Sequence, residues 1–187
     1  MMLENLIVDL SHDPFNAKLN FDVAVEYEHL NQTASAVSFY LRCAEYGMDT
    51  HPEYAYTSLL KLAKCFDDQN DRINTVSNCL LQAIAFLPYR REGYFLLSRF
   101  YERTQQWQEC YTFAQMGLRQ YAMPTLPVDV DYKGEYCLRF EAAVSAYWLG
   151  RKKESLKLFT ELSYESIALE YETAVKSNLE RIHNASI

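Results

Sequence analysis

One short acidic motif in the sequence could bind a metal ion, judged by its spacing. Asp129-Val130-Asp131 reads DxD, and two carboxylates at this spacing can hold a divalent cation against a diphosphate. Such a pair works at the end of a strand in a nucleotide-binding fold, whereas here prolines precede it and a predicted helix start follows. We therefore interpret both aspartates as polar loop residues whose charge favours the start of the next helix.

The remaining nucleophilic and titratable residues form no catalytic motif. The five cysteines include no CxxC pair, so neither a zinc site nor a disulfide framework is indicated. The sequence has no glycine-rich phosphate loop, no GxSxG and no HExxH, and Asp67-Asp68 lies in a predicted turn. We therefore predict no enzymatic activity, no cofactor and no metal site, although a catalytic domain elsewhere in a longer chain or in a partner stays open.

Composition and charge disfavour several classes of protein. The formal net charge of −7 argues against nucleic acid as the partner. No apolar run reaches the roughly 18 to 20 residues that a membrane helix needs. The first residues, MMLENLIVDLSHDP, lack the basic region of a secretory signal. We interpret the cysteines as small apolar core residues in a reducing compartment and expect a cytoplasmic protein.

The prolines indicate a repeated unit. Pro14, Pro52, Pro88 and Pro124 are separated by 38, 36 and 36 residues. Proline fits the first turn of a helix and is excluded from helix interiors. A proline at a steady interval of this size therefore predicts a repeated helical unit.

A set of small and bulky residues recurs at fixed offsets within this period. After the first residue of each set, the others follow 3, 12, 16 and 19 positions later. The sets are Ala24, Tyr27, Ala36, Tyr40 and Cys43; Ser98, Tyr101, Cys110, Ala114 and Gly117; and Ala143, Ala146, Ser155, Phe159 and Leu162. A further set, Ala63, Phe66, Cys79, Ala83 and Phe86, fits if about four residues are inserted around DDQNDRIN, a polar stretch where a turn lengthens at little cost.

Small residues at this spacing are typical of paired antiparallel helices. They let two helix backbones approach closely, while aromatic residues fill the space where the next pair stacks. Because a single pair cannot bury its apolar face, such pairs stack into a solenoid. The alternative is a generic helical bundle in which the spacing is coincidental.

The pattern resembles the tetratricopeptide repeat, a helical motif of about 34 residues. The tryptophan usual in the first helix of that repeat is missing, and its turn glycine is present only as Gly150, with Asn31 and Gln105 at the equivalent places. The resemblance implies an all-α fold: a right-handed α-solenoid of about four degenerate helix pairs with N- and C-terminal capping helices.

These observations predict one repeat domain over residues 1–187. Its units are expected at about 13–48, 51–88, 89–121 and 133–163, with an amphipathic helix at about 3–11 and a cap helix at 164–184. The predicted helix pairs are 15–30 with 33–47, 52–68 with 72–87, 91–104 with 106–120, and 134–149 with 152–163. Residues 121–133, which contain two prolines, are predicted to form the only long loop.

Three longer stretches carry a narrower resemblance. They are DPFNAKLNFDVAVEYEHLNQTASAVSFYLRCAEYG, LPYRREGYFLLSRFYERTQQWQECYTFAQMGL and FEAAVSAYWLGRKKESLKLF. They resemble the helical-repeat region that follows family 2 glycosyltransferase domains in bacteria and large phages, including marine ones. An LPxRxE-like turn (Leu87 to Glu92), an AYWxG-like helix (Ala146 to Gly150) and a closing ERIHN (180 to 184) match that region. The catalytic domain of that family is absent from this sequence, so the resemblance implies an accessory module, standing alone or cut from a longer chain.

A stack of helix pairs has a concave face lined by the first helix of each pair, where we expect a partner to bind. Residues one turn on either side of the small residue in each first helix should point there. They are Phe21, Val25 and Glu28; Leu60, Lys64 and Asp67; Phe95, Arg99 and Glu102; and Phe140, Val144 and Tyr147. Rings mixed with single charges suit an apolar peptide or helix with polar tethers. The alternative that some of these rings belong to the core stays open.

The sequence thus predicts a noncatalytic scaffold that binds a protein or peptide and is associated with a glycosyltransferase system. Two alternatives stay open: an accessory fragment or subunit of a glycosyltransferase, and a self-associating structural assembly protein of phage origin. A homodimer is compatible with the sequence because the ends of a solenoid are apolar when uncapped.

Overall fold

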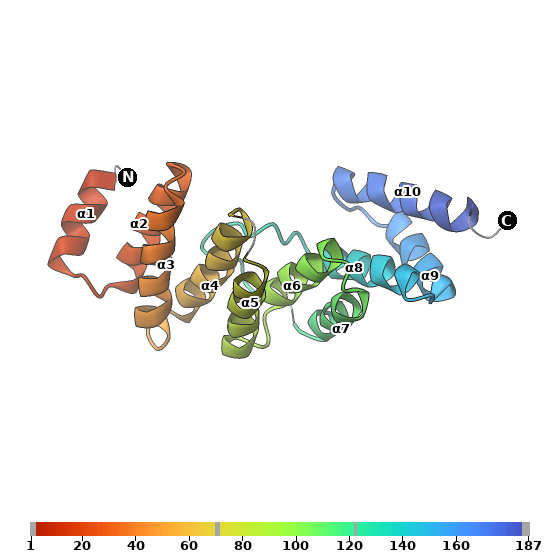
Figure 1. Cartoon of the computed structure of the whole chain (residues 1–187), viewed down its shortest axis with the longest axis horizontal. Coiled ribbons are helices and arrows are strands. Elements are labelled where there is room, and N and C mark those ends of the chain that lie inside the picture. The colour runs from red at the N-terminus through yellow and green to blue at the C-terminus, as the bar shows by residue number, and fades with distance from the viewer. Residues whose placement is uncertain (1–2, 70–71, 122, 185–187) are drawn as a thin grey trace. The chain divides into compact units, whose positions relative to one another are not determined.

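The computed structural model describes residues 3–69, 72–121 and 123–184, and all regular secondary structure within them is α-helical. Figure 1 shows the helices along the chain. They are α1 (Leu3–His12), α2 (Ala17–His29), α3 (Thr33–Gly47), α4 (Pro52–Asp67), α5 (Ile73–Phe86), α6 (Arg91–Arg103), α7 (Trp107–Leu118), α8 (Glu135–Trp148), α9 (Lys152–Ser163) and α10 (Leu169–Asn184). The predicted all-α fold is confirmed.

The chain divides into two compact units. Unit 1 comprises the described residues up to Pro88 together with Pro124–Val130, and unit 2 comprises those of Tyr89–Met123 and from Asp131 onward. Unit 1 therefore holds α1 to α5, and unit 2 holds α6 to α10. We call the first helix of each pair (α2, α4, α6 and α8) an A helix. The single repeat domain predicted for 1–187 stays a prediction.

The turns inside three helix pairs share one backbone conformation. Asn31, Gln105 and Gly150 have φ angles of 56°, 58° and 78°, the left-handed region in which many helices end. In each turn the next amide donates to the carbonyl five positions earlier: Gln32 to Tyr27 at 2.9 Å, Gln106 to Tyr101 at 2.8 Å and Arg151 to Ala146 at 2.9 Å. The predicted equivalence of these turns is thus confirmed. The insertion expected in the remaining pair includes residues 70 and 71, which lie outside the described residues.

The small residues of the recurring sets lie where helices pack closely. Those that are completely buried, at 0% exposure, are Ala24, Ala36, Cys43, Ala83, Ser98, Cys110, Ala114, Ala143, Ala146 and Ser155. Gly117 shows how close the approach is, because a Cβ added there would lie 2.8 Å from Cβ of Tyr94 and 2.9 Å from Cδ2 of Leu138. A side chain at this point would force α6, α7 and α8 apart.

Aromatic rings repeat the same register in both units. Tyr27 stacks on Phe39 with ring centroids 5.5 Å apart, and Tyr101 stacks on Phe113 at 5.6 Å. Each tyrosine stands three positions after the first small residue of its set, and each phenylalanine 15 positions after it. The repeat is therefore present in side-chain contacts as well as in the backbone.

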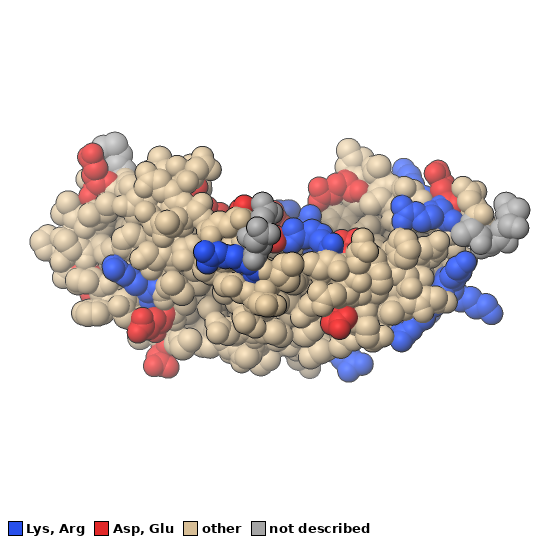
Figure 2. All heavy atoms as spheres, viewed as in Figure 1, with Lys and Arg blue, Asp and Glu red and all other residues tan. Residues whose placement is uncertain are grey.

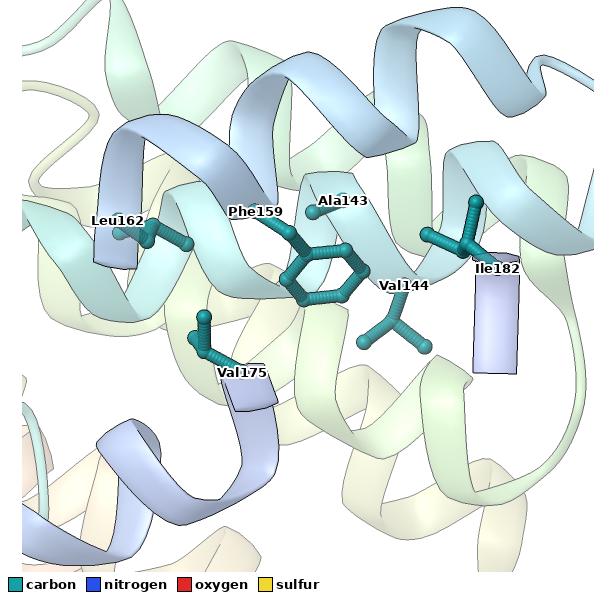
Figure 3. Close-up of a cluster of buried hydrophobic side chains, with 6 residues drawn as sticks. All are labelled: Ala143, Val144, Phe159, Leu162, Val175 and Ile182. Atoms are coloured by element: carbon teal, nitrogen blue, oxygen red, sulfur yellow. The ribbon is translucent and has the colours of Figure 1, made fainter. Parts of the chain in front are cut away.

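Helices α1 and α10 cover apolar faces of the helices next to them. In unit 1, Leu6 and Leu10 of α1 are buried in a cluster with Val23 of α2. In unit 2, α10 contributes to the cluster of α8 and α9 that Figure 3 shows around the ring of Phe159. The other members of this cluster are Ala143, Val144, Leu162, Val175 and Ile182.

Candidate functional site

The twelve residues predicted to line a concave face differ widely in exposure. Phe21, Leu60, Phe95 and Val144 are buried, at 2%, 1%, 0% and 9% exposure. The half-buried ones are Val25, Glu28, Asp67, Glu102, Phe140 and Tyr147, and the exposed ones are Lys64 and Arg99. A fully packed side chain is not accessible to a partner, so the half-buried and exposed residues form the candidate contact surface. The role of all twelve in binding stays a prediction.

Unit 1 has a pocket on its A-helix side. Its volume is about 290 Å³, close to the lower end of the range for small-ligand sites, about 300 Å³. It is lined by Leu6 of α1; Phe21, Asp22, Val25 and Glu26 of α2; Tyr54 of α4; and Pro127 and Val128. Helical spacing predicted only Phe21 and Val25 among these. It could not predict the other six, because they lie on other helix faces and on a loop.

Aromatic rings stiffen one wall of this pocket. The ring of Phe21 meets that of Tyr54 edge-on at 5.2 Å and that of Tyr40 at 5.8 Å. Nζ of Lys18 lies 6.0 Å from the centre of the Tyr54 ring. Edge-to-face contacts stabilise a fold beyond the area that they bury, so the chain itself holds the ring of Phe21 in place on this wall.

A segment from far along the chain forms another wall of the pocket. Pro127 and Val128 belong to residues 124–130, which contain neither helix nor strand and which join unit 1 from the stretch between α7 and α8. In Figure 1 this segment is part of the blue-green trace. The chain thus places its own irregular segment against the surface of unit 1 where a partner is predicted to bind.

The α2 wall of the pocket is acidic. Asp22 and Glu26 stand four residues apart and therefore share a helix face. No described lysine or arginine forms an ion pair with either carboxylate. Burial raises the pKa of Asp22, Lys18 opposes this rise, and the charge of Glu26 adds to it. The α2 wall of the pocket therefore carries two acidic groups that form no direct ion pair, with Lys18 as a nearby cation.

A charged pair joins the two A helices of unit 1. Nζ of Lys61 in α4 lies 3.0 Å from Oε1 of Glu28 in α2, and the hydroxyl of Tyr40 donates to Oε2 of Glu28 at 2.6 Å. Burial alone would raise the pKa of Glu28. The hydrogen bond from Tyr40 and the charge of Lys61 outweigh burial and lower this pKa. This position therefore favours the ionised carboxylate.

The equivalent positions of unit 2 hold two acids. Counted from the small residues of the A helices, Glu102 takes the place of Glu28, and Glu141 takes that of Lys61. Glu141 is 4% exposed, and its Oε2 lies 3.9 Å from Sγ of Cys110, a weak donor. Burial, followed by the charge of Glu102, raises the pKa of Glu141 to about 8. A carboxyl group that favours its neutral form thus stands where unit 1 has a cation.

Helix α10 covers the predicted contact face of α8. The ring of Tyr171 meets that of Phe140 edge-on at 5.1 Å and that of Tyr136 at 5.2 Å. Phe140 also meets Phe159 of α9 at 5.7 Å, and Val144 is part of the cluster in Figure 3. The apolar residues predicted on α8 therefore pack against the chain itself.

The LPxRxE-like stretch contains a buried ion pair. Arg90 is 1% exposed, and its Nη2 and Nε donate to the two carboxylate oxygens of Glu92 at 2.8 and 3.2 Å. Paired hydrogen bonds of this kind offset the cost of burying both charges. The two residues therefore pair with each other at the start of α6, which gives this motif a structural explanation.

The residues considered for catalysis do not converge. Within the described residues, no group of three or more His, Cys, Asp or Glu is placed to hold a metal ion, and Asp129 and Asp131 are both exposed. Burial raises the pKa of all five cysteine thiols, those of Cys43 and Cys65 to about 11. A nucleophilic cysteine needs the opposite shift.

The surface offers no broad basic patch on the face in Figure 2. There, the lysines and arginines over α9 and α10 are interleaved with acidic and uncharged side chains. No helix in the part of the chain that the structure describes is long and apolar enough to cross a bilayer.

Comparison with known proteins identifies the fold. No family model and no curated protein match the sequence, but solved structures do. YrrB, described as a tetratricopeptide repeat (TPR) protein with an unusual peptide-binding site, is 12% identical, with 99% of this chain and 85% of that chain covered and a TM-score of 0.72. A TPR protein from Parabacteroides merdae is 14% identical, covering 97% and 66% of the two chains with a TM-score of 0.68. MamA is 13% identical, covering 84% and 82% with a TM-score of 0.64. The chain therefore has the helix-pair fold of TPR proteins.

Proposed function

We propose that this chain is a noncatalytic scaffold that binds peptide segments of protein partners on its A-helix faces. The observation that carries the proposal is the pocket of unit 1, because it combines apolar rings with acidic groups beside α2 and α4, the helices on which we predict the contact face of unit 1. Such a mixture suits a peptide that inserts apolar side chains and is oriented by a few charges. The likeness in fold to YrrB, described as having a peptide-binding site, supports the proposal.

A peptide array tests this function. Fluorescently labelled full-length chain is incubated with random 12-residue peptides and with the tiled proteins of the source organism. We expect a subset of peptides to bind with micromolar dissociation constants. Val25→Glu places a charge in the pocket wall and should weaken the hits by about tenfold or more, which corresponds to about 1.4 kcal/mol.

The matched control makes the same change on another surface of unit 1. Leu41 of α3 is 52% exposed and is not part of the pocket, so Leu41→Glu should leave binding unchanged. The proposal fails if no peptide binds, or if both variants reduce binding equally.

A finer proposal links the scaffold to a glycosyltransferase system in the cytoplasm. Its support is the three sequence stretches that resemble glycosyltransferase-associated repeats, together with free cysteines that are mostly buried. We expect a protein with a family 2 glycosyltransferase domain to be encoded beside this chain or in frame with it, and to co-purify with it. Absence of such a gene and such a partner would remove the link, and turnover of a nucleotide sugar by the purified chain would overturn the noncatalytic role.

Self-association is a second finer proposal. Ile7 and Val8 on α1 are 42% and 56% exposed, and apolar residues on a terminal helix of a repeat stack can pair with a second copy. Light scattering tests it: a dimer that Ile7→Glu dissociates supports the proposal, and a monomer at high concentration contradicts it.

A further inference from the structure

The pocket of unit 1 is built partly by a segment that could be displaced. Five of the pocket's eight lining residues come from α1 and α2 and one from α4, whereas Pro127 and Val128 come from the irregular segment 124–130. Leu126, Val128 and Val130 are half-buried, and the other residues of the segment are exposed. A segment without helix or strand costs less to detach than a helix costs to unpack.

The composition of the segment indicates what this surface accepts. Its sequence, PTLPVDV, contains two prolines and three apolar residues and carries one charge, that of Asp129. Prolines restrict the unfolded chain and so lower the entropy lost when a segment docks. The pocket that Pro127 and Val128 help to line is therefore suited to a proline-containing peptide with small apolar side chains.

The charge of the pocket indicates what the segment lacks. Asp22 and Glu26 both line the pocket, and segment 124–130 contains no lysine or arginine. Its one charge has the same sign as theirs. A ligand with a basic residue next to a proline would supply the cation that the chain's own segment cannot.

We infer that segment 124–130 occupies the binding surface of unit 1 as an internal competitor, and that the partner is an extended, proline-containing peptide with an arginine or lysine that pairs with Asp22 and Glu26. This inference rests on the proposed function and specifies its ligand. The partner displaces the segment because it keeps the proline contacts and adds an ion pair. Binding is weakened by the fraction of time that the segment is docked.

Three labelled peptides and the full-length chain test the inference by fluorescence anisotropy. The first copies the segment, PTLPVDV. The second carries the change Asp129→Arg, giving PTLPVRV, and the third also replaces both prolines, giving ATLAVRV. We expect PTLPVRV to bind about tenfold more tightly than PTLPVDV. We expect ATLAVRV to bind about fivefold more weakly than PTLPVRV, because the flexible peptide loses more entropy.

Variants of the chain separate the two parts of the inference. Pro127→Gly with Val128→Gly should release the internal segment and tighten binding of PTLPVRV about tenfold, the change expected if the segment is docked about nine-tenths of the time. Asp22→Asn with Glu26→Gln should bring PTLPVRV and PTLPVDV to within about twofold of each other. Glu45→Gln changes an exposed acid of α3 outside the pocket and should leave both affinities unchanged.

Hydrogen exchange on the unaltered chain gives a readout that needs no variant to fold. Saturating PTLPVRV should speed amide exchange in residues 125, 126 and 128–130 by about tenfold as the segment detaches. Faster exchange there supports displacement. Unchanged or slower exchange overturns it.

The remaining outcomes decide between the inference and the proposed function. If all three peptides bind equally to the chain and to its variants, the inference is wrong while a peptide-binding function stands. If none of them binds but the peptide array yields Val25-dependent ligands of other composition, the inference again falls alone. If neither experiment yields a ligand, both fall.

Discussion

The two units differ in what covers the faces of their A helices. In unit 2 the 16-residue helix α10 covers α8, and its side chains complete an apolar cluster around Phe159. In unit 1 the irregular segment 124–130 covers part of the α2 and α4 side and leaves a pocket of about 290 Å³. A helix presents a row of side chains at every turn and can fill a face, whereas a short irregular segment contacts it at few points. The A-helix face thus becomes part of the core where a helix packs on it, and it stays a candidate binding surface where only an irregular segment packs on it.

The units also use one pair of equivalent positions in opposite ways. Between the A helices of unit 1, Glu28 is paired with Lys61 at 3.0 Å. At the same register in unit 2, Glu141 is buried beside Glu102, and burial raises its pKa. A nearby cation favours the ionised carboxylate, while burial next to another acid favours the protonated one. The two units should therefore respond to pH in opposite directions.

We expect the largest effect from a substitution in the apolar cluster that α8, α9 and α10 form in unit 2. Phe159 is 1% exposed at the centre of its cluster, so Phe159→Ala should destabilise unit 2 by about 3–5 kcal/mol. Val128→Ala makes a smaller truncation in the cover of unit 1 and should cost less than about 1 kcal/mol. Urea unfolding combined with hydrogen exchange of each unit measures both changes. Similar losses for the two variants would show that the covers are equally well packed.

The next effect concerns the close helix approach at Gly117 in unit 2. Gly117→Ala would bring a Cβ to 2.8 Å from Cβ of Tyr94, and we expect a loss of about 2 kcal/mol, confined to unit 2. The equivalent place in unit 1 already holds a side chain, that of Cys43, so Cys43→Ala should cost about 1 kcal/mol. The same unfolding experiment compares them. A neutral or stabilising Gly117→Ala would contradict the tight packing of α6 to α8.

A pH titration sharpens the comparison of the acid positions. Burial raises the pKa of Glu141 from 4.5 to about 8, so the folded protein binds more protons than the unfolded chain between these values. As far as this group is concerned, the free energy of unfolding of unit 2 should be highest below about pH 4.5, and should fall by up to about 1.4 kcal/mol per pH unit as pH rises to about 8. Glu141→Gln should remove that slope. An unchanged slope in this variant would assign the pH dependence to other groups.

The smallest effect concerns the charged pair of unit 1. Lys61→Met should cost about 1 kcal/mol at neutral pH because Glu28 loses its ion-pair partner and keeps the hydrogen bond from Tyr40 and the charge of Lys64. Since the pKa of Glu28 is lowered in the fold, its contribution is present above its ordinary value of 4.5 and is lost as pH falls through the folded pKa. In Lys61→Met, the free energy of unfolding should fall less at acid pH than it does in the unaltered chain, as measured by urea unfolding. An equal fall in both proteins would show that Lys61 does not cause it.

The helices and their turns could be predicted from the sequence because their signals are local or periodic. Pro52 begins α4, and the equivalence of Asn31, Gln105 and Gly150 follows from counting positions in each repeat. The small residues at fixed offsets were predictable for the same reason, since close helix packing admits few residue types. Each of these predictions depends on residues within one or two repeats.

The covers of the two A-helix faces could not be predicted in this way. That segment 124–130 joins unit 1, and that Tyr171 packs on Phe140, depend on contacts between residues far apart in the chain. Phe21 and Phe95 were predicted to contact a partner because each lies one helical turn from a small residue, but both are buried. Helical spacing predicts the side of the helix on which a residue lies, and it does not predict which part of the chain packs against that side. The pairing of Glu141 with Glu102 could have been predicted from the sequence. Glu141 stands two positions before the small residue of its A helix, and the equivalent position in unit 1 holds Lys61.

The central claim is that the chain's own segment 124–130 lies on the surface of unit 1 that receives the ligand. Methyl-labelled NMR of the full-length chain tests this most directly. We predict cross-relaxation between the methyl groups of Val128 and ring protons of Phe21 or Tyr54 in the free chain, and its loss on addition of PTLPVRV. Absence of these contacts in the free chain, or their persistence at saturating peptide, would contradict the account.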